Sequence, residues 1–294
     1  MTQRSIATNA LTNLQNTQAR TAKLQEQITS GTSLSKGSDD SVRAAAALRL
    51  NDQIAVNTEN GRNLTEARGW MTTQEPALQS TTDALQKVRD LTVQAANGSL
   101  DSNGLKAIAA QISEIKKTVM GDANTQYQGR AVFAGTSATT TAFDPTTYAS
   151  NDDGGAVIRT ISAGTNMTVN ASGNAVYGAQ TAGGSTLFAE LDQLATDIAA
   201  GNVNSSTVTL STIDSRINLA TNATAVIGAR TNQLDHAEDV NTNQLQYLTA
   251  QLDDVQGVDP AKAYLEFTQQ QVAYQAALQV TAKSVQTTLL DFLR

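Results

Sequence analysis

"SGTSLSKGSDDSVRAAAALRL", residues 30–50, separates two helical patterns and decides how this chain is organised. Its first half contains two glycines that break a helix, and its second half is an alanine-rich helical run. Asp39, Asp40 or Ser41 can cap that run, because their side-chain oxygens accept hydrogen bonds from the unpaired N–H groups of a first helical turn. The stretch therefore predicts the end of one helix and the start of a longer one.

The residues before this stretch carry apolar side chains at a seven-residue spacing. Ala7, Leu14 and Ile28 lie on one row, and Ala10 and Leu24 lie on the row three residues further on. A sustained heptad pattern predicts a coiled coil. Threonines interrupt the seam, so the helix would be weak alone and would need packing partners.

After the stretch, helical patterns continue to about residue 123. One seven-residue row comprises Leu50, Leu64, Met71, Leu78 and Leu85. Pro76 lies inside that row and predicts a helix boundary or kink near Gln74–Glu75, because proline lacks an N–H donor and restricts the preceding residue. A second amphipathic stripe comprises Leu105, Ile108, Ile112, Ile115 and Val119.

The middle of the chain has no helical period. Residues 137–185 are rich in Gly, Asn, Ser and Thr, and they contain short β-branched runs that predict strands near 156–162 and 166–171. Helix resumes near residue 187 with a stripe of Leu187, Leu191, Leu194 and Ile198. A longer pattern over about 206–254 places Ile213, Ala220, Ile227, Leu234 and Leu248 on one row.

The last helix has a clear start. Asp259 is a plausible N-cap and Pro260 a plausible first helical residue. Six large apolar residues then share one heptad lattice: Tyr264, Phe267, Tyr274, Leu278, Val285 and Phe292. The chain thus carries a heptad seam near each end.

These patterns predict a mainly α fold. We expect a long antiparallel helical bundle or coiled coil formed by both chain halves, with a small β-rich inserted lobe that protrudes separately. Residues 1–42 and 257–294 would form a terminal coiled-coil region, residues 43–136 and 187–256 a helical stem, and residues 137–186 the β-rich outer lobe.

Composition excludes several classes of function. The net charge of −7 and the pI of about 4.7 disfavour nucleic acid and anionic membranes as partners. The chain has no cysteine and one histidine, His236, so thiol catalysis, a histidine triad and a multi-histidine metal site are not available. We expect no catalytic, cofactor-binding or metal-binding residues, and hence no enzyme. Residues 1–30 also lack the features of a signal peptide.

"NTQYQGRAVFAGT", residues 124–136, places two aromatic rings where the helical pattern stops. Tyr127 and Phe133 are expected to fix the loop in which the chain leaves the helical stem. Gly129 and Gly135 would permit the tight turns that this loop needs. A ligand-binding role for the two rings is a much weaker interpretation.

Two long stretches resemble bacterial flagellins. One is the glycine-serine break with Asp-Asp and an alanine-rich helix at 30–50, and the other is "ALQSTTDALQKVRDLTVQAANG" at 77–98. Within that family, the form of residues 127–136 and the ending Leu289-Leu290-Asp291-Phe292-Leu293 are similar to hook–filament junction proteins, the third class of hook-associated proteins. The similarity covers roughly residues 1–136 and 187–294.

The resemblance implies a structural subunit of the bacterial flagellum that joins the hook region to the flagellin filament. Such a protein is exported unfolded, without a cleaved signal peptide, and assembles outside the cell through its terminal helices. Its implied partners are other copies of itself, a neighbouring hook-associated junction protein, flagellin and an export chaperone. The alternatives are a flagellin, and then a non-flagellar helical fibre or adhesin protein.

The two terminal seams are the candidate assembly interface, because they hold too few large apolar groups to be stable by themselves. Its residues are Leu14, Leu24, Ile28, Tyr264, Phe267, Tyr274, Leu278, Val285, Leu289 and Phe292. We expect both ends of the isolated chain to be cleaved readily by proteases while the stem resists.

Overall fold

The computed structural model describes residues 3–34, 36–98, 100–179 and 185–292, and for residues 3–7, 205 and 283–292 it describes the backbone only. The described chain is mainly helical with two short antiparallel sheets, which confirms the predicted fold class.

The chain divides into two compact units. Unit 1 comprises residues 1–56 and 244–294, and unit 2 comprises residues 57–243. The division falls within helices α2 (Ser41–Ala96) and α6 (Leu210–Gln256), so each of these two helices contributes to both units.

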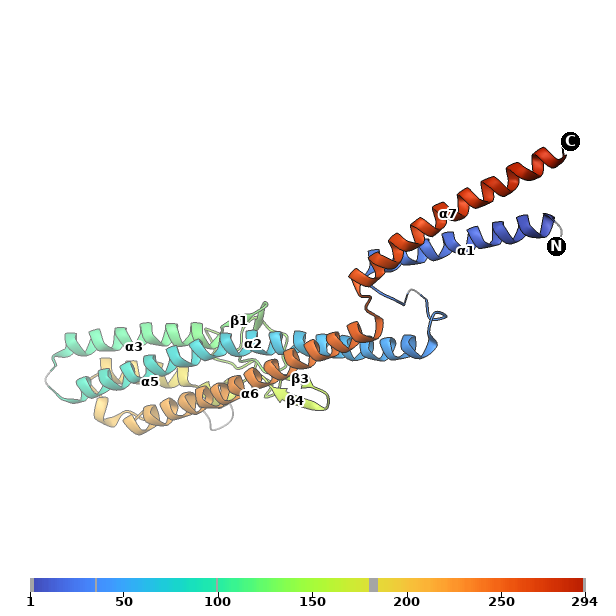
Figure 1. The fold of residues 1–294 in the computed structure, drawn as a ribbon. Helices are drawn as coiled ribbons and strands as arrows, with labels where there is room; N and C mark the ends of the chain where they lie inside the picture. Colours follow the sequence, from blue (N-terminus) through green and yellow to red (C-terminus); the bar gives the residue numbers. More distant parts are fainter. Residues whose placement is uncertain (1–2, 35, 99, 180–184, 293–294) are drawn as a thin grey trace. The chain divides into compact units, whose positions relative to one another are not determined.

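Unit 1 is built around two terminal helices. Helix α1 (Gln3–Ser30) and helix α7 (Pro260–Phe292) lie side by side and antiparallel, so the two chain ends lie at the same end of the pair (Figure 1). The predicted cap is confirmed, because the Asp259 side chain accepts from the N–H groups of Ala261 and Lys262 at 2.9 and 3.1 Å. Among the described residues of this unit, the only buried hydrophobic side chains are Ala47, Leu248 and Ala263.

Unit 2 holds the main hydrophobic core. Helices α2, α3 (Ser102–Ala123), α5 (Leu187–Ala199) and α6 run alongside one another in Figure 1. The apolar rows predicted from the sequence face the core of unit 2, which confirms the predicted buried faces of these helices. The buried members are Leu64, Met71, Leu78 and Leu85 of α2, Ile108, Ile112 and Val119 of α3, Leu187, Leu191, Leu194 and Ile198 of α5, and Ile213, Ala220, Ile227 and Leu234 of α6.

Of the boundary or kink predicted near Gln74–Glu75, the boundary is wrong. Helix α2 continues through Pro76 as far as Ala96. Buried residues on both sides of the proline, including Leu78, hold the helix in place by packing. Gln74 is buried too, and it donates to the Val132 carbonyl at 2.6 Å and accepts from the Ala171 N–H at 3.1 Å. Tertiary contacts therefore compensate for the hydrogen bond that proline cannot make.

The stretch at 124–136 forms a hairpin. Strands β1 (Gln126–Tyr127) and β2 (Arg130–Ala131) are joined by Gln128 and Gly129, which both have positive φ (50° and 78°), as a type I′ turn requires. The Tyr127 ring packs edge-on against Trp70 of α2 with ring centroids 6.0 Å apart. The hairpin is thus fastened to the helices through Tyr127, as predicted.

Phe133 lies just beyond the hairpin and is fully buried. Its ring packs edge-on against Tyr177 of helix α4 (Gly173–Tyr177), with centroids 5.5 Å apart. Tyr177 also contacts Phe143 and Phe188, whose rings lie 5.6 and 5.8 Å away. The second predicted anchor therefore belongs to an aromatic cluster in the core of unit 2.

Residues 156–171 form the predicted strands. Strand β3 (Ile158–Ser162) pairs antiparallel with β4 (Thr165–Thr168). Helix α4 follows these strands, and a short 3-10 helix (Val203–Ser205) lies between α5 and α6. The inserted segment differs from the separate lobe expected from the sequence, because its buried side chains, such as Phe143 and Val169, join the same hydrophobic cluster as the helices of unit 2.

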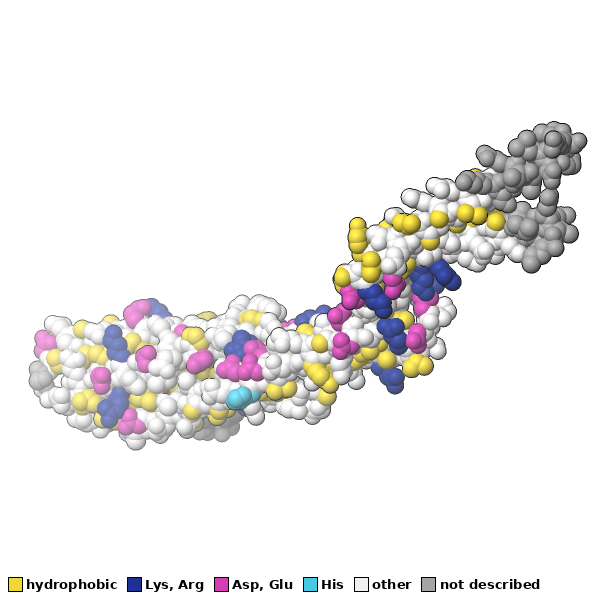
Figure 2. Space-filling model, in the orientation of Figure 1, with side chains coloured by type: hydrophobic (Ala, Val, Ile, Leu, Met, Phe, Trp, Pro, Cys, Tyr) yellow, Lys and Arg dark blue, Asp and Glu magenta, His cyan; other side chains and the backbone are white. Residues whose placement is uncertain are grey.

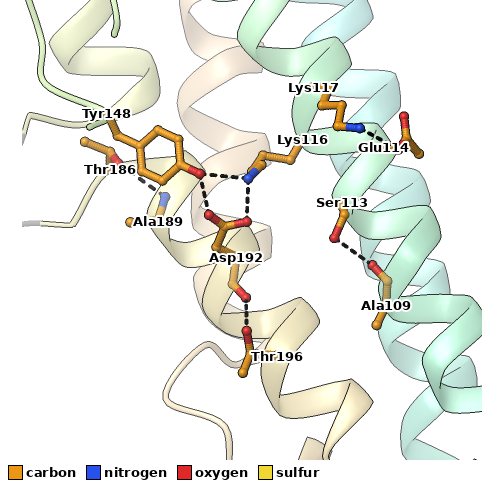
Figure 3. A network of polar contacts seen from close by, with 10 residues as sticks. All are labelled: Ala109, Ser113, Glu114, Lys116, Lys117, Tyr148, Thr186, Ala189, Asp192 and Thr196. Atoms are coloured by element: carbon orange, nitrogen blue, oxygen red, sulfur yellow. Dashed lines mark hydrogen bonds and ion pairs between the residues drawn. The ribbon is translucent and has the colours of Figure 1, made fainter. Parts of the chain in front are cut away.

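Polar contacts also fasten the inserted segment to the helices. Figure 3 shows Lys116 of α3, Tyr148 of the insert and Asp192 of α5 converging. The Lys116 ammonium donates to the Tyr148 hydroxyl at 2.7 Å and to the Asp192 carboxylate, which also accepts from the Tyr148 hydroxyl. Burial lowers the pKa of Lys116, but the bonds to Asp192 and Tyr148 raise it to a greater extent. Lys116 is therefore held charged by these two partners.

Candidate assembly interface

The predicted interface residues lie in the α1–α7 pair of unit 1. Leu14, Leu24 and Ile28 of α1 are half-buried, as are Phe267 and Tyr274 of α7. These side chains lie on the face that each helix turns toward the other, since residues spaced by three, four or seven positions share one face of a helix. They form a thin seam within the molecule, here called the inner seam.

Other predicted residues lie outside that seam. Tyr264 and Leu278 of α7 are 63% and 42% exposed, although they share a heptad row. The structure therefore divides the predicted set into an inner seam and an outward row. Hydrophobic side chains are visible at the surface of the α1–α7 pair in Figure 2, among polar ones.

Further exposed apolar residues of the α1–α7 pair were missed by the sequence analysis. Leu265, Val272 and Val280 of α7 are 57%, 67% and 67% exposed, and Leu11 of α1 is 54% exposed. The seven-residue spacing of Leu265 and Val272 is a signal that could have identified them. Tyr264, Leu265, Val272, Leu278 and Val280 are spread around the exposed side of α7, and we call this exposed side the outer α7 face.

Val285, Leu289 and Phe292 were also predicted as interface residues. Their backbone belongs to α7, but their side chains lie outside the described residues.

A shallow groove lined mostly by polar residue types lies beside the inner seam. Its volume is about 400 Å³. It is lined from α1 by Arg20, Lys23, Leu24 and Gln27, and from α7 by Glu266, Gln269 and Gln270. Lys23 also forms an ion pair with Asp39 at 2.7 Å, which ties α1 to the segment that follows it.

The segment that follows α1 and the segment that precedes α7 meet at one junction. An antiparallel bridge pairs Thr32 with Gly257, and the Val258 N–H donates to the Gly31 carbonyl at 3.3 Å. Gly31 has a φ of +71°, which ends α1 with a sharp turn that favours glycine. The two helices of the inner seam are therefore connected at their bases by main-chain hydrogen bonds.

The same junction caps the end of α6. The last carbonyls of a helix have no partner within it. Here the Gln256 carbonyl accepts from the Ser33 N–H at 2.6 Å, and the Val255 carbonyl accepts from Arg43 Nε at 2.9 Å. The Arg43 guanidinium also donates to the Ser33 hydroxyl at 2.9 Å. A cation at this end of a helix is favourable, because the negative end of the helix dipole lies there.

Asp40 fixes the position of Arg43. Its carboxylate accepts from the N–H groups of Val42 and Arg43 at 3.1 and 3.0 Å and so caps α2. Of the three caps considered from the sequence, Asp40 is the one that binds the first turn. Residues within the segment 33–43 thus cap the N-terminus of α2 and the C-terminus of α6.

In the described part of the chain, no group of three or more His, Asp or Glu side chains is arranged to hold a metal ion. Within the same ranges, no helix combines the length and the apolar character needed to cross a membrane. His236 is exposed on α6.

Two family models match the chain. The bacterial flagellin N-terminal helical region matches residues 2–138, and the bacterial flagellin C-terminal helical region matches residues 210–293. Together they include both helices of the inner seam and the long helices of unit 2.

Curated relatives match over most of their length. The chain is 24% identical to flagellar hook-associated protein 3 of Escherichia coli K12 over 283 residues, which cover 89% of both chains. It is 27% identical to a flagellin of Bacillus subtilis 168 over 293 residues, which cover 95% of this chain and 94% of that one.

Solved structures share the fold. A structure described as a flagellar hook-associated protein from Vibrio parahaemolyticus matches with a TM-score of 0.66 and 21% identity, over 74% of this chain and 100% of that one. FlgL of Bacillus cereus matches with a TM-score of 0.59 and 22% identity, over 70% of this chain and 99% of that one. With both flagellin helical regions present in their order along the chain, the predicted family is confirmed: the chain belongs to the bacterial flagellin family, whose members are structural components of the flagellum.

Proposed function

We propose that this chain is the subunit that joins the hook region of the bacterial flagellum to the flagellin filament. The observation that carries the choice between junction protein and flagellin is the form of residues 127–136. Their Tyr-Gln-Gly-Arg and Phe-Ala-Gly-Thr pattern resembles junction proteins, as stated above. The alignment with hook-associated protein 3 of Escherichia coli over 89% of both chains supports the same choice.

The contacts of this stretch support its use as a distinguishing feature. The Arg130 guanidinium lies over the Trp70 ring, 5.6 Å from its centroid, and donates to the Thr136 carbonyl at 3.1 Å. The Thr136 N–H donates to the Asp153 carboxylate at 2.8 Å. Arg130 and Thr136 thus each take part in the local structure of this stretch.

The thin core of unit 1 supports assembly through the terminal helices. Only Ala47, Leu248 and Ala263 are buried hydrophobic residues among those described there, while the outer α7 face exposes large apolar side chains. Neighbouring subunits that cover this face would offset the entropy lost when the ends become ordered. We propose other copies of this chain, a neighbouring hook-associated junction protein and flagellin as those neighbours.

We further propose a division of roles along the chain. Residues 1–42 and 257–294 form the assembly region, residues 43–136 and 187–256 form the stem, and residues 137–186 face outward. Export occurs in an unfolded state without a signal peptide, to the outside of the cell, with a chaperone that binds the C-terminal region. These assignments rest on the family resemblance.

Deletion of the gene in its source bacterium tests the junction role. Hooks should remain on the cells, and flagellin should be released into the medium because it has no platform on which to polymerise. A plasmid copy of the gene should restore attached filaments. Attached filaments in the deletion strain would rule out the junction role.

The alternative, a flagellin, predicts different behaviour. Purified chain added to filament fragments would then extend them into long filaments. We expect the purified chain to stay unpolymerised under conditions in which flagellin from the same bacterium extends the fragments.

A further inference from the structure

The sequence Asn-Gly occurs three times in this chain, at residues 60–61, 97–98 and 103–104. Asparagine followed by glycine can lose its side-chain amide without an enzyme. The reaction depends on local structure, so three identical pairs in one chain allow a direct comparison of their surroundings.

The chemistry sets the structural requirements. The main-chain nitrogen of the glycine attacks Cγ of the asparagine, forming an N–Cγ bond, while the Cγ–Nδ2 bond breaks and ammonia leaves. Water then opens the resulting five-membered imide at either carbonyl, giving aspartate or isoaspartate. The glycine nitrogen must be available, and the backbone must be free to bring it to Cγ. Glycine offers the least steric obstruction because it has no Cβ.

Asn60–Gly61 does not meet these requirements. Both residues lie inside α2, where main-chain nitrogens are engaged in the helical hydrogen-bond ladder. Asn60 is only 7% exposed. The space beside Gly61 is occupied as well, since a Cβ there would lie 3.2 Å from Asn241 Oδ1.

Asn103–Gly104 is protected in another way. Asn103 is exposed, but the pair lies in the first turn of α3. The Gly104 N–H donates to the Asp101 side chain at 2.8 Å, as part of the N-cap of that helix. The nitrogen required for attack is therefore held by Asp101. Leu100 also packs closely beside Gly104.

Asn97–Gly98 differs from both pairs. It follows Ala96, the last residue of α2, so it lies outside the regular helix. Both residues are exposed. Gly98 has a φ of +66°, and nothing lies within 4 Å of the position that a Cβ would occupy. The side chain and the glycine nitrogen can approach one another here without displacing a packed group.

We propose that Asn97 is a site of spontaneous deamidation in the folded protein and that it converts ahead of Asn60 and Asn103. The proposal does not depend on the flagellar role. Its product adds a negative charge at the C-terminal end of α2, where the helix dipole is also negative, and isoaspartate inserts an extra carbon into the backbone before α3. The α2–α3 connection would thus change with the age of the protein.

The test is incubation of the purified full-length chain in mildly alkaline buffer, followed by peptide mapping with mass spectrometry that separates aspartate from isoaspartate. Asn97 should convert at least about tenfold faster than Asn60, because a helical site must first open locally. Incubation in concentrated urea should bring the three rates close together. Equal rates at Asn97 and Asn60 in buffer, or an unchanged difference in urea, would overturn the proposal.

A substitution tests the protection of Asn103 separately. Asp101→Ala removes the acceptor of the Gly104 N–H and should accelerate conversion of Asn103 about fivefold, the factor expected for loss of a typical N-cap. Glu114→Ala, an exposed change later in α3, is the matched control and should leave that rate unchanged. If Asp101→Ala had no more effect than Glu114→Ala, the cap would not be what protects this pair.

Discussion

Arg43 donates from Nε to the main-chain carbonyl of Val255 at 2.9 Å, across 212 positions of the sequence. The contact caps the C-terminus of α6 with a side chain from the first turn of α2. Because the Ser33 N–H binds the adjacent Gln256 carbonyl, the segment after α1 belongs to the same junction. The Arg43 guanidinium thus holds the base of the terminal pair in unit 1 together with the main-chain hydrogen bonds of the junction.

Arg43→Ala should therefore weaken the junction. Loss of a charge-assisted hydrogen bond to a half-buried carbonyl costs about 2 kcal/mol. Limited proteolysis of the full chain should show faster cleavage within residues 31–40, with little change in unit 2. Arg43→Lys should give an intermediate effect, since an ammonium lacks the planar fork of arginine.

Arg49→Ala is the matched control for this prediction. Arg49 is exposed on α2, and its side chain donates to the Ala45 carbonyl of the same helix at 3.3 Å. Its removal should leave cleavage at residues 31–40 unchanged. Equal cleavage of the Arg43 and Arg49 variants would show that the junction is not held by Arg43.

Leu278→Asp tests whether the outer α7 face is covered in the assembly. Leu278 lies outside the inner seam, so the isolated variant should keep its helix content. Burial of an unpaired carboxylate in a subunit interface is strongly unfavourable, and incorporation into the flagellum should fall at least about tenfold. Immunolabelling of isolated hooks with attached filaments measures the incorporation.

Two further variants serve as controls for Leu278→Asp. Gln53→Asp adds the same charge to unit 1 at an exposed position of α2, away from the outer α7 face, and should incorporate normally. Phe267→Asp, in the inner seam, should instead reduce the helix content of the isolated chain. Normal incorporation of the Leu278→Asp variant would show that no neighbouring subunit covers the outer α7 face at this position.

Gln74→Ala should destabilise unit 2. The variant leaves the Val132 carbonyl and the Ala171 N–H without their buried partner, at a cost of about 2–4 kcal/mol. Trp70 is the only tryptophan of the chain and is buried in this unit, so its fluorescence follows urea unfolding there. Gln79→Ala, at an exposed position of the same helix, should unfold at the urea concentration of the unchanged chain.

Periodicity was sufficient to predict the buried faces of the long helices in unit 2. Residues such as Leu78 and Ile227 occupy the buried faces that their seven-residue rows indicated. The proline at 76 was misleading, because a local rule cannot include the contacts of Gln74 with residues far along the chain. The packing of Phe143 and Tyr177 against Phe188 was also beyond prediction, since nothing in a single sequence pairs distant aromatic rings.

The candidate interface was predicted as one set of residues. In the structure, some of these residues lie in the inner seam and others lie on the outer α7 face. A heptad lattice identifies which residues share a side of α7, but it cannot say how wide the contact with α1 is. Phe267 and Tyr274 lie inside that contact, whereas Tyr264 and Leu278 lie beyond its edge. The Arg43 junction had no local signal, because no sequence pattern pairs Arg43 with its acceptors, the Val255 carbonyl and the Ser33 hydroxyl.

The final prediction concerns a half-buried carboxylate of unit 2. Asp122 of α3 lies near the fully buried Tyr177, whose hydroxyl is 3.1 Å from the Thr81 hydroxyl. Burial raises the pKa of the Asp122 carboxyl above its ordinary value of 3.8, although hydrogen bonds from Ser80 and Thr81 act in the opposite direction. The carboxyl is thus more easily protonated in the folded chain than in the unfolded chain.

The sign of its effect on stability follows from this shift. A carboxyl with a raised folded-state pKa contributes most favourably below its unfolded pKa, and that contribution is lost as the pH rises through the folded-state pKa. Asp122→Asn cannot ionise, so it should stabilise unit 2 at about pH 7 and give a smaller gain at about pH 4. Urea unfolding followed by Trp70 fluorescence measures both values, with Asp90→Asn at an exposed position of α2 as the control. A gain that was the same at both pH values would show that ionisation of Asp122 does not limit the stability of this core.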